Sequence, residues 1–119
     1  MYSRWKYFER SEFACKCCGE NLIVEAFVDI LDEAREKAEI PFIILRGYKC
    51  EENNKVSGGT ETSAYLKGLA ADIRAKDRDE KSRILHGVIL AGIRRIFIYR
   101  NYITVDVDHS KKACIMILS

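Results

Sequence analysis

Four of the five cysteines are spaced so that their thiols could form one site. Cys15, Cys17 and Cys18 lie within four consecutive positions, and Cys50 follows on a later segment. Thiolates at such short spacing are favoured ligands of zinc, so a structural zinc ion is one interpretation. Only Cys15 and Cys18 have Cys-x-x-Cys spacing, and no second pair of this kind exists. Two other interpretations stay open: a Cys15–Cys50 contact, reduced or oxidised, and isolated buried thiols.

Two aspartates, Asp72 and Asp106, are candidates for acid–base chemistry. Each lies in a segment whose apolar residues are typical of a strand. Such a pair could act as acid and base without a metal, although amide hydrolysis by two carboxylates requires a closely shared proton. The sequence has two histidines, His86 and His109. We expect His86 on the surface of a helix and His109 in a solvated turn.

The first secondary-structure element expected to position these residues is a helix over residues 22–39. Apolar residues recur there at three- and four-residue steps, which places one apolar stripe along the helix. Asn21 is the predicted N-cap, and Pro41 prevents the helix from continuing. Residues 42–45 read as a short buried strand. Residues 46–68 follow as an irregular, glycine-containing connection of a length that usually marks a functional loop.

The second half of the chain predicts one helix and four strands. The strands cover residues 69–75, 96–99, 103–108 and 114–118, and the helix covers residues 79–90. In the third of these strands Thr104, Asp106 and Asp108 share one face, opposite three apolar residues. Cys114 is predicted to lie in the core. The pattern indicates an α+β fold, a small antiparallel sheet packed with helices, formed by residues 1–119 as a single domain.

Composition excludes several classes of function. The chain has 119 residues, with 20 Lys and Arg against 18 Asp and Glu, so its net charge is +2. This balance predicts no nucleic-acid partner, since the dispersed basic residues read as solvated surface, and no attraction to a membrane surface. The longest apolar stretches, residues 40–45 and 113–118, fall far short of the ~20 residues that span a bilayer. No apolar signal segment is visible, so we expect synthesis in the cytoplasm.

Three motifs between residues 46 and 72 resemble those of the zinc D-alanyl-D-alanine carboxypeptidase family (peptidase M15-like). They are Gly47-Tyr48-Lys49-Cys50, then Asn54-Lys55 with Gly58-Gly59, then Ser63 through Gly68 and Ala70 to Asp72. The opening Ser11-Glu12-Phe13-Ala14-Cys15 and the closing residues 96–106 also resemble this family, so the likeness covers nearly the whole chain. It implies the fold that this family shares with the amino-terminal domain of hedgehog proteins.

The resemblance implies a metal site that this sequence has altered. Two histidines and an aspartate hold zinc in the family; here the aspartate is Asp72, but the histidine positions are Tyr65 and Thr104. A phenol must lose a proton of pKa ~10 to become a ligand, and a threonine hydroxyl is weaker still. Asp106 is kept where the family carries an acid close to the metal. The sequence therefore predicts a pocket without a cofactor.

The substituted residues suggest a positive role. Tyr65 can fill the volume of a histidine and donate a hydrogen bond to Asp72. Arg46 stands where the family has serine and Lys49 where it has arginine, so a cation near Asp72 and Asp106 could keep both acids ionised. We hypothesise that a former zinc pocket has been rebuilt as a salt-bridged pocket. Its predicted residues are Arg46, Tyr48, Ser63, Tyr65 and Thr104.

These residues lead to a first hypothesis, a catalytically degenerate homologue of a peptidoglycan carboxypeptidase from a bacterium or a phage. It would bind a peptidoglycan peptide or a protein partner, or serve as a structural part of a larger assembly. Family members commonly occur in bacterial and phage lysis or tail proteins, so release from the cell or incorporation into a virion also fits the resemblance. The oligomeric state is left open.

The alternative is an active zinc metallopeptidase that cleaves peptidoglycan stem peptides with an atypical ligand set. Asp72 would then bind zinc together with Asp106, His109 or Tyr65. The resemblance implies that Asp106 takes a proton from metal-activated water and that Lys49 holds the substrate carboxylate or the developing oxyanion. His109 follows Asp106 by three positions, so a bulge or the strand end would have to turn it inward.

Overall fold

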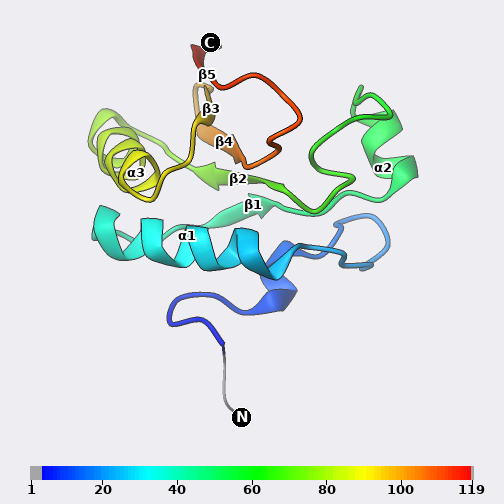
Figure 1. Ribbon diagram of the computed structural model, residues 1–119, viewed down its shortest axis with the longest axis horizontal. Helices are drawn as coiled ribbons and strands as arrows, with labels where there is room; N and C mark the ends of the chain where they lie inside the picture. The colour runs from blue at the N-terminus through cyan, green and yellow to red at the C-terminus, as the bar shows by residue number, and fades with distance from the viewer. Residues whose placement is uncertain (1–3, 119) are drawn as a thin grey trace.

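The computed structural model describes residues 4–118 and has one five-stranded sheet with helices on both faces (Figure 1). The strand order is β1-β2-β4-β3-β5, and every neighbouring pair is antiparallel except β3 and β5, which are parallel. The predicted α+β class is confirmed. The strands are β1 (Ile44–Arg46), β2 (Ala70–Arg74), β3 (Arg95–Ile98), β4 (Tyr102–Asp106) and β5 (Cys114–Ile117).

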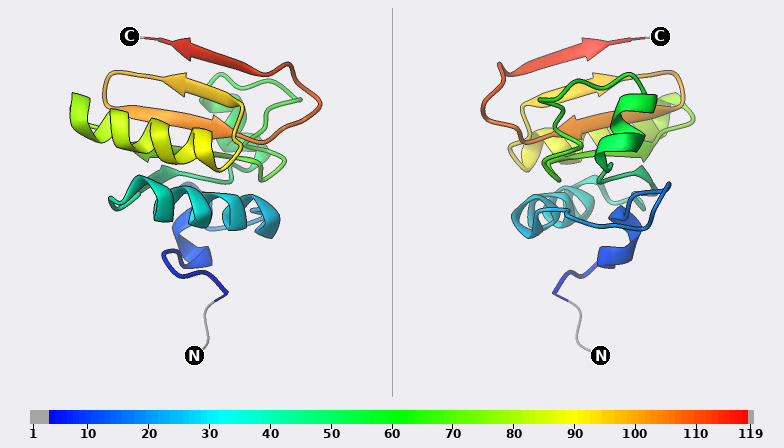
Figure 2. Two further views of the ribbon diagram at one scale, coloured as in Figure 1. Left: turned by 60° about the vertical axis from the view of Figure 1, so that its left-hand side comes forward. Right: turned by 90° about the vertical axis from the view of Figure 1, so that its right-hand side faces the viewer.

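Two long helices cover one face of the sheet, and a short helix lies on the other (Figure 2). α1 (Glu25–Ala38) and α3 (Arg78–Leu90) pack side by side, and the core lies between them and the sheet. Their approach requires Gly87, because a Cβ there would lie 2.3 Å from the carbonyl oxygen of Ala34. On the opposite face lies α2 (Glu51–Val56), and a short 3-10 helix, η1 (Arg10–Phe13), precedes α1.

Alternation along β4 separates the core from the polar face. Ile103 and Val105 are fully buried in the core, as expected from the pattern. Thr104 and Asp106, on the other face, line a cavity beneath α2. The sheet therefore carries hydrophobic packing on one side and polar groups on the other.

Two predicted helix details are wrong. α1 begins at Glu25 with Val24 as its N-cap, because the Asn21 side chain is used elsewhere: it accepts from Ile23 N at 3.2 Å and donates to the Arg10 carbonyl at 2.8 Å. The connection predicted to be irregular contains α2, whose polar sequence has no apolar stripe that could indicate a helix.

The last strand also departs from expectation. Among the described strands, β5 lies at the edge and pairs with β3 alone, in parallel, so the sheet is not purely antiparallel. Cys114 is half-buried and is absent from the core, since β5 extends beyond the cover of the helices. Among residues 4–118, no helix combines the length and the apolar character that crossing a bilayer requires.

Candidate functional site

The candidate site is centred on Asp72 in the middle of β2. Its side chain is 2% exposed. Strand pairing places Thr104 of β4 beside it on one side and Arg46 of β1 on the other. Three neighbouring strands therefore bring polar side chains together at one buried carboxylate.

Asp72 receives three donors. Thr104 Oγ1 donates to Asp72 Oδ1 at 2.8 Å, and the Tyr65 hydroxyl donates to the same oxygen, as expected from the sequence. Arg46 Nε donates to Oδ2 and forms an ion pair with it. Burial and the neighbouring Asp72 charge raise the pKa of Tyr65, so the phenol remains a donor. The carboxylate is thus charge-balanced and hydrogen-bonded on both oxygens.

The groups around Asp72 do not fit a zinc ion. Zinc prefers imidazole nitrogen, thiolate sulfur and carboxylate oxygen. Here a single carboxylate meets two protonated hydroxyls and the guanidinium of Arg46, which has no lone pair to offer. Burial is the largest influence on the pKa of Arg46 and would lower it, but the hydrogen bond to Asp72 and the charge of Asp72 together raise that pKa above its usual value, so the cation persists.

Asp106 has a different cation as its partner. Arg95, opposite it on β3, donates from Nε to the two Asp106 oxygens at 2.8 and 3.1 Å. The backbone N–H of Asp108 donates to Asp106 as well, at 3.0 Å. We expected Arg46 or Lys49 to serve both acids, whereas Arg46 pairs with Asp72 and Arg95 with Asp106. The sequence interpretation of Arg95 as solvated surface is therefore wrong.

His109 is exposed in the turn after β4 and lines a second cavity, of about 160 Å³, with Asp106 and Asp108. No described contact joins His109 to Asp72. Within residues 4–118, neither residue belongs to a group of three or more His, Cys, Asp or Glu side chains whose ligand atoms converge. His86 is exposed on α3, as expected.

A cavity of about 320 Å³ opens in front of the Asp72 cluster. Its walls include five predicted site residues, Lys49, Ser63, Tyr65, Thr104 and Asp106, together with the aromatic rings of Phe97 and Tyr99. Tyr48 is buried but faces elsewhere, since its hydroxyl donates to Glu20 at 3.2 Å. The structure therefore brings most of the predicted pocket residues together around one hollow.

Lys49 is the cation of this cavity that has no acidic partner. It is half-buried, with Nζ 4.0 Å from the centroid of the Tyr65 ring. Across the described part of the chain, no carboxylate lies within ion-pair distance of its ammonium group. Burial lowers the pKa of Lys49, although the Asp72 charge acts in the opposite direction. A ligand that brings a negative charge would relieve this desolvation.

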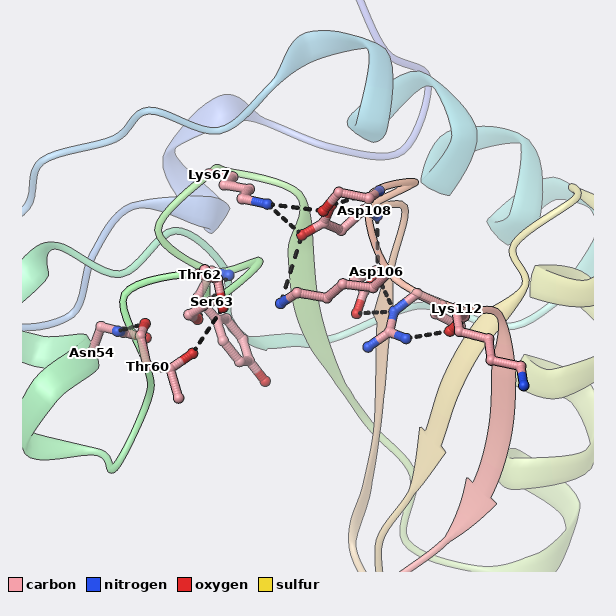
Figure 3. A network of polar contacts seen from close by, with 12 residues as sticks. Asn54, Thr60, Thr62, Ser63, Lys67, Asp106, Asp108 and Lys112 are labelled. Carbon is pink, nitrogen blue, oxygen red and sulfur yellow. Dashed lines mark hydrogen bonds and ion pairs between the residues drawn. The ribbon is translucent and has the colours of Figure 1, made fainter.

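A second polar network supports the loop behind the cavity (Figure 3). Lys67 Nζ donates to Asp108 Oδ2 at 2.8 Å, and Ser110 donates to the other oxygen at 2.6 Å. Burial raises the pKa of Asp108, but these hydrogen bonds outweigh it and lower the pKa. The sequence predicts Lys67 on a solvated surface, and its side chain is exposed, but the ion pair that it forms with the buried Asp108 was not predicted. The only signal was the position of Asp108 on the polar face of the strand predicted over residues 103–108, which in the structure ends at Asp106.

The four cysteines outside β5 converge. The sulfur atoms of Cys15, Cys17, Cys18 and Cys50 all lie within 4.8 Å of one another, and all four are free thiols. Cys15 and Cys50 are in contact, as one interpretation expected, through the Cys50 N–H and the Cys15 sulfur at 3.5 Å. The interpretation of isolated thiols is wrong for these residues.

Two long helices on one face of a mostly antiparallel sheet, with a polar pocket and the short α2 on the other, form the architecture that the resemblance to zinc carboxypeptidases implies. Comparison with protein families agrees: residues 6–108 match the family model described as peptidase M15. The chain belongs to the peptidase M15 family. The match extends from the N-terminal segment to just beyond β4 and leaves out β5. A search among curated proteins finds no match.

Proposed function

We propose that this chain is a non-hydrolytic member of the family, and that its cavity binds the C-terminal carboxylate of a peptide. The observation that carries the proposal is that the Asp72 carboxylate is fully hydrogen-bonded within the protein. Both of its oxygens are engaged by Arg46, Tyr65 and Thr104. The residue types at this position supply donors to a carboxylate rather than lone pairs to an ion.

The remaining groups do not replace the missing chemistry. Hydrolysis of an amide in this family relies on a metal that lowers the pKa of bound water. A metal-independent base would need a carboxylate that is free to accept a proton, but both oxygens of Asp106 accept hydrogen bonds from Arg95 Nε, at 2.8 and 3.1 Å. Without an activated water or a free base, the cavity can still bind a peptide but does not hydrolyse it.

The charge of the cavity favours a carboxylate ligand. Lys49 offers an unpaired, half-buried ammonium group, whereas Asp106 is already paired. Phe97 and Tyr99 provide apolar surface for the side chain next to a peptide C-terminus. We propose a peptidoglycan stem peptide as the ligand, because family members act on D-alanine termini; binding to a protein C-terminus is the competing outcome.

The test is a titration of the protein with acyl-D-Ala-D-Ala, its L,L isomer and its C-terminal amide, followed by NMR. We expect binding of the D,D acid, with weaker binding of the amide. Lys49→Gln should reduce affinity about tenfold or more, since it removes a charge-assisted hydrogen bond. Lys76→Gln is the matched control, because Lys76 is exposed and lies outside the cavity walls.

Activity is measured in parallel. We expect no release of D-alanine from stem peptides, with or without added zinc. Zinc-dependent release would contradict the proposal and support the alternative, a working metallopeptidase with an atypical ligand set. Preference for L-terminal peptides would favour a protein partner, and absence of binding to any of the three ligands would overturn the binding role.

A further inference from the structure

A cluster of sulfur atoms lies outside the cavity. Three of its cysteines come from one turn before α1, and the fourth, Cys50, comes from the end of the segment that precedes α2. Cys15 is buried and Cys50 half-buried, while Cys17 and Cys18 are exposed. The cluster is therefore open to solvent on one side, which gives an ion a path of entry.

The spacing of the sulfur atoms suits a tetrahedral metal ion. With zinc–sulfur bonds of about 2.3 Å, two ligands of a tetrahedral site are about 3.8 Å apart. Cys17 Sγ and Cys50 Sγ are 3.5 Å apart, and no pair in the cluster exceeds 4.8 Å. Small side-chain rotations would place all four around one centre. Four converging free thiols are more than a single disulfide would use.

Backbone geometry holds the turn in shape. The N–H of Gly19 donates to the Cys15 carbonyl at 2.8 Å, and the Cys15 N–H donates to the Glu20 carbonyl at 2.7 Å. Gly19 has φ of +80°, in the left-handed region that favours glycine. These bonds close the turn on itself and present Cys17 and Cys18 on the same side as Cys15.

Neighbouring N–H groups point at the sulfur atoms. Cys15 Sγ accepts from Cys50 N at 3.5 Å and from Asn53 Nδ2 at 3.4 Å, and Cys50 Sγ accepts from Asn53 N at 3.4 Å. Donors around a sulfur stabilise its thiolate form and fix its orientation, as outer partners of metal ligands do. Asn53 serves two of the four sulfur atoms.

We propose that Cys15, Cys17, Cys18 and Cys50 bind one zinc ion, which joins the N-terminal turn to the start of α2. Four thiolates in tetrahedral arrangement select zinc among the common divalent ions that lack redox chemistry. The site is structural, since four protein ligands leave no position for a substrate. The proposal is independent of the proposed function, because none of these residues lines the cavity.

The experiment measures metal in the full chain, purified with a reductant. We expect about one zinc per chain by elemental analysis, and thiolate-to-metal charge-transfer absorption after replacement by Co²⁺. The double variant Cys17→Ser/Cys18→Ser should lose the ion. These two residues are exposed, so the variant creates no cavity, and circular dichroism checks its fold. Cys114→Ser is the matched control and should keep the ion, because Cys114 lies outside the cluster.

A second measurement follows thermal unfolding with a chelator. Removal of the ion should lower Tm by at least about 5 °C in the wild type and in Cys114→Ser, with no shift in the double variant. The proposal would be overturned by no zinc in the purified or zinc-supplemented protein, by full zinc retention in the double variant, or by iron in place of zinc. A disulfide between two of the four cysteines in the reduced preparation would overturn it as well.

Discussion

The Asp72 pocket and the four-cysteine cluster both gather polar side chains from distant segments, yet they are suited to opposite tasks. Around Asp72, two hydroxyls and a guanidinium surround one acceptor. In the cluster, four sulfur atoms face one another, all within 4.8 Å. Convergence is common to both regions. The kind of atom that converges decides whether an ion or a hydrogen-bond network occupies the centre.

The two regions are joined by residues 48–50. The N–H of Lys49 donates to the Tyr65 carbonyl at 3.3 Å, while the next N–H, of Cys50, donates to the Cys15 sulfur. Neighbouring peptide groups thus reach the two sites. Metal ligands introduced into the pocket should make it behave like the cluster, and unfolding and binding measurements show what each region contributes to stability and to ligand binding.

The largest expected effect is a gain of zinc binding in the pocket. Tyr65→His with Thr104→His supplies two imidazoles next to Asp72, and adding Arg46→Ser removes the cation that already neutralises it. The triple variant should bind zinc at least about 100-fold more tightly than its parent. It is made in the Cys17→Ser/Cys18→Ser background, so that calorimetry reports the pocket alone.

The matching control for this gain is the double histidine variant with Arg46 retained. We expect it to bind zinc more weakly than the triple variant, because the guanidinium repels the ion and competes for Asp72. If the triple variant gains no affinity, positions 65 and 104 do not correspond to the ligand positions of the family.

The next largest effect concerns stability. Arg46→Met leaves the buried Asp72 charge without its cation, and we expect a loss of about 3 kcal/mol in the free energy of unfolding. Arg83→Met is the control, since the exposed pair of Arg83 with Asp79 should contribute less than about 1 kcal/mol. Urea unfolding measures both. Equal losses in the two variants would show that the pocket charge is not held by Arg46.

Acid sensitivity should be traceable to Asp108. Its pKa is lowered in the folded state, so its contribution is present above the unfolded-state pKa of about 3.9 and is lost as the pH falls toward the lower folded value. Asp108→Asn should remove about 2 kcal/mol at neutral pH and flatten the acid side of the stability profile. If the free energy of unfolding of wild type and of Asp108→Asn depends on pH in the same way, the acid sensitivity does not come from Asp108. Asp79→Asn, at an exposed position, is the control.

The sequence predicted the elements that its local patterns encode. The stripes of α1 and α3 and the alternation of β4 were sufficient to place these elements, and the motif likeness identified Asp72, Tyr65 and Thr104 as neighbours. What it missed depends on tertiary partners. Arg95 reads as a surface residue until the strand register brings it to Asp106, and the loop path brings the exposed Lys67 to the buried Asp108. The convergence of the cysteines was one of the interpretations left open, because the contact between their two segments follows from no spacing rule.

The smallest expected effect tests whether the two regions act separately. We expect the metal cluster to act on the cavity only by restricting the motion of the segment that carries Lys49. Cys17→Ser/Cys18→Ser should then weaken binding of acyl-D-Ala-D-Ala by about two- to threefold, which corresponds to a coupling free energy of about 0.5 kcal/mol. The NMR titration proposed above measures it beside Lys49→Gln. A loss as large as that of Lys49→Gln would mean that the cluster and the cavity form one binding unit. No loss at all would mean that the hydrogen bond from Lys49 N to Tyr65 positions the lysine without help from the cysteines.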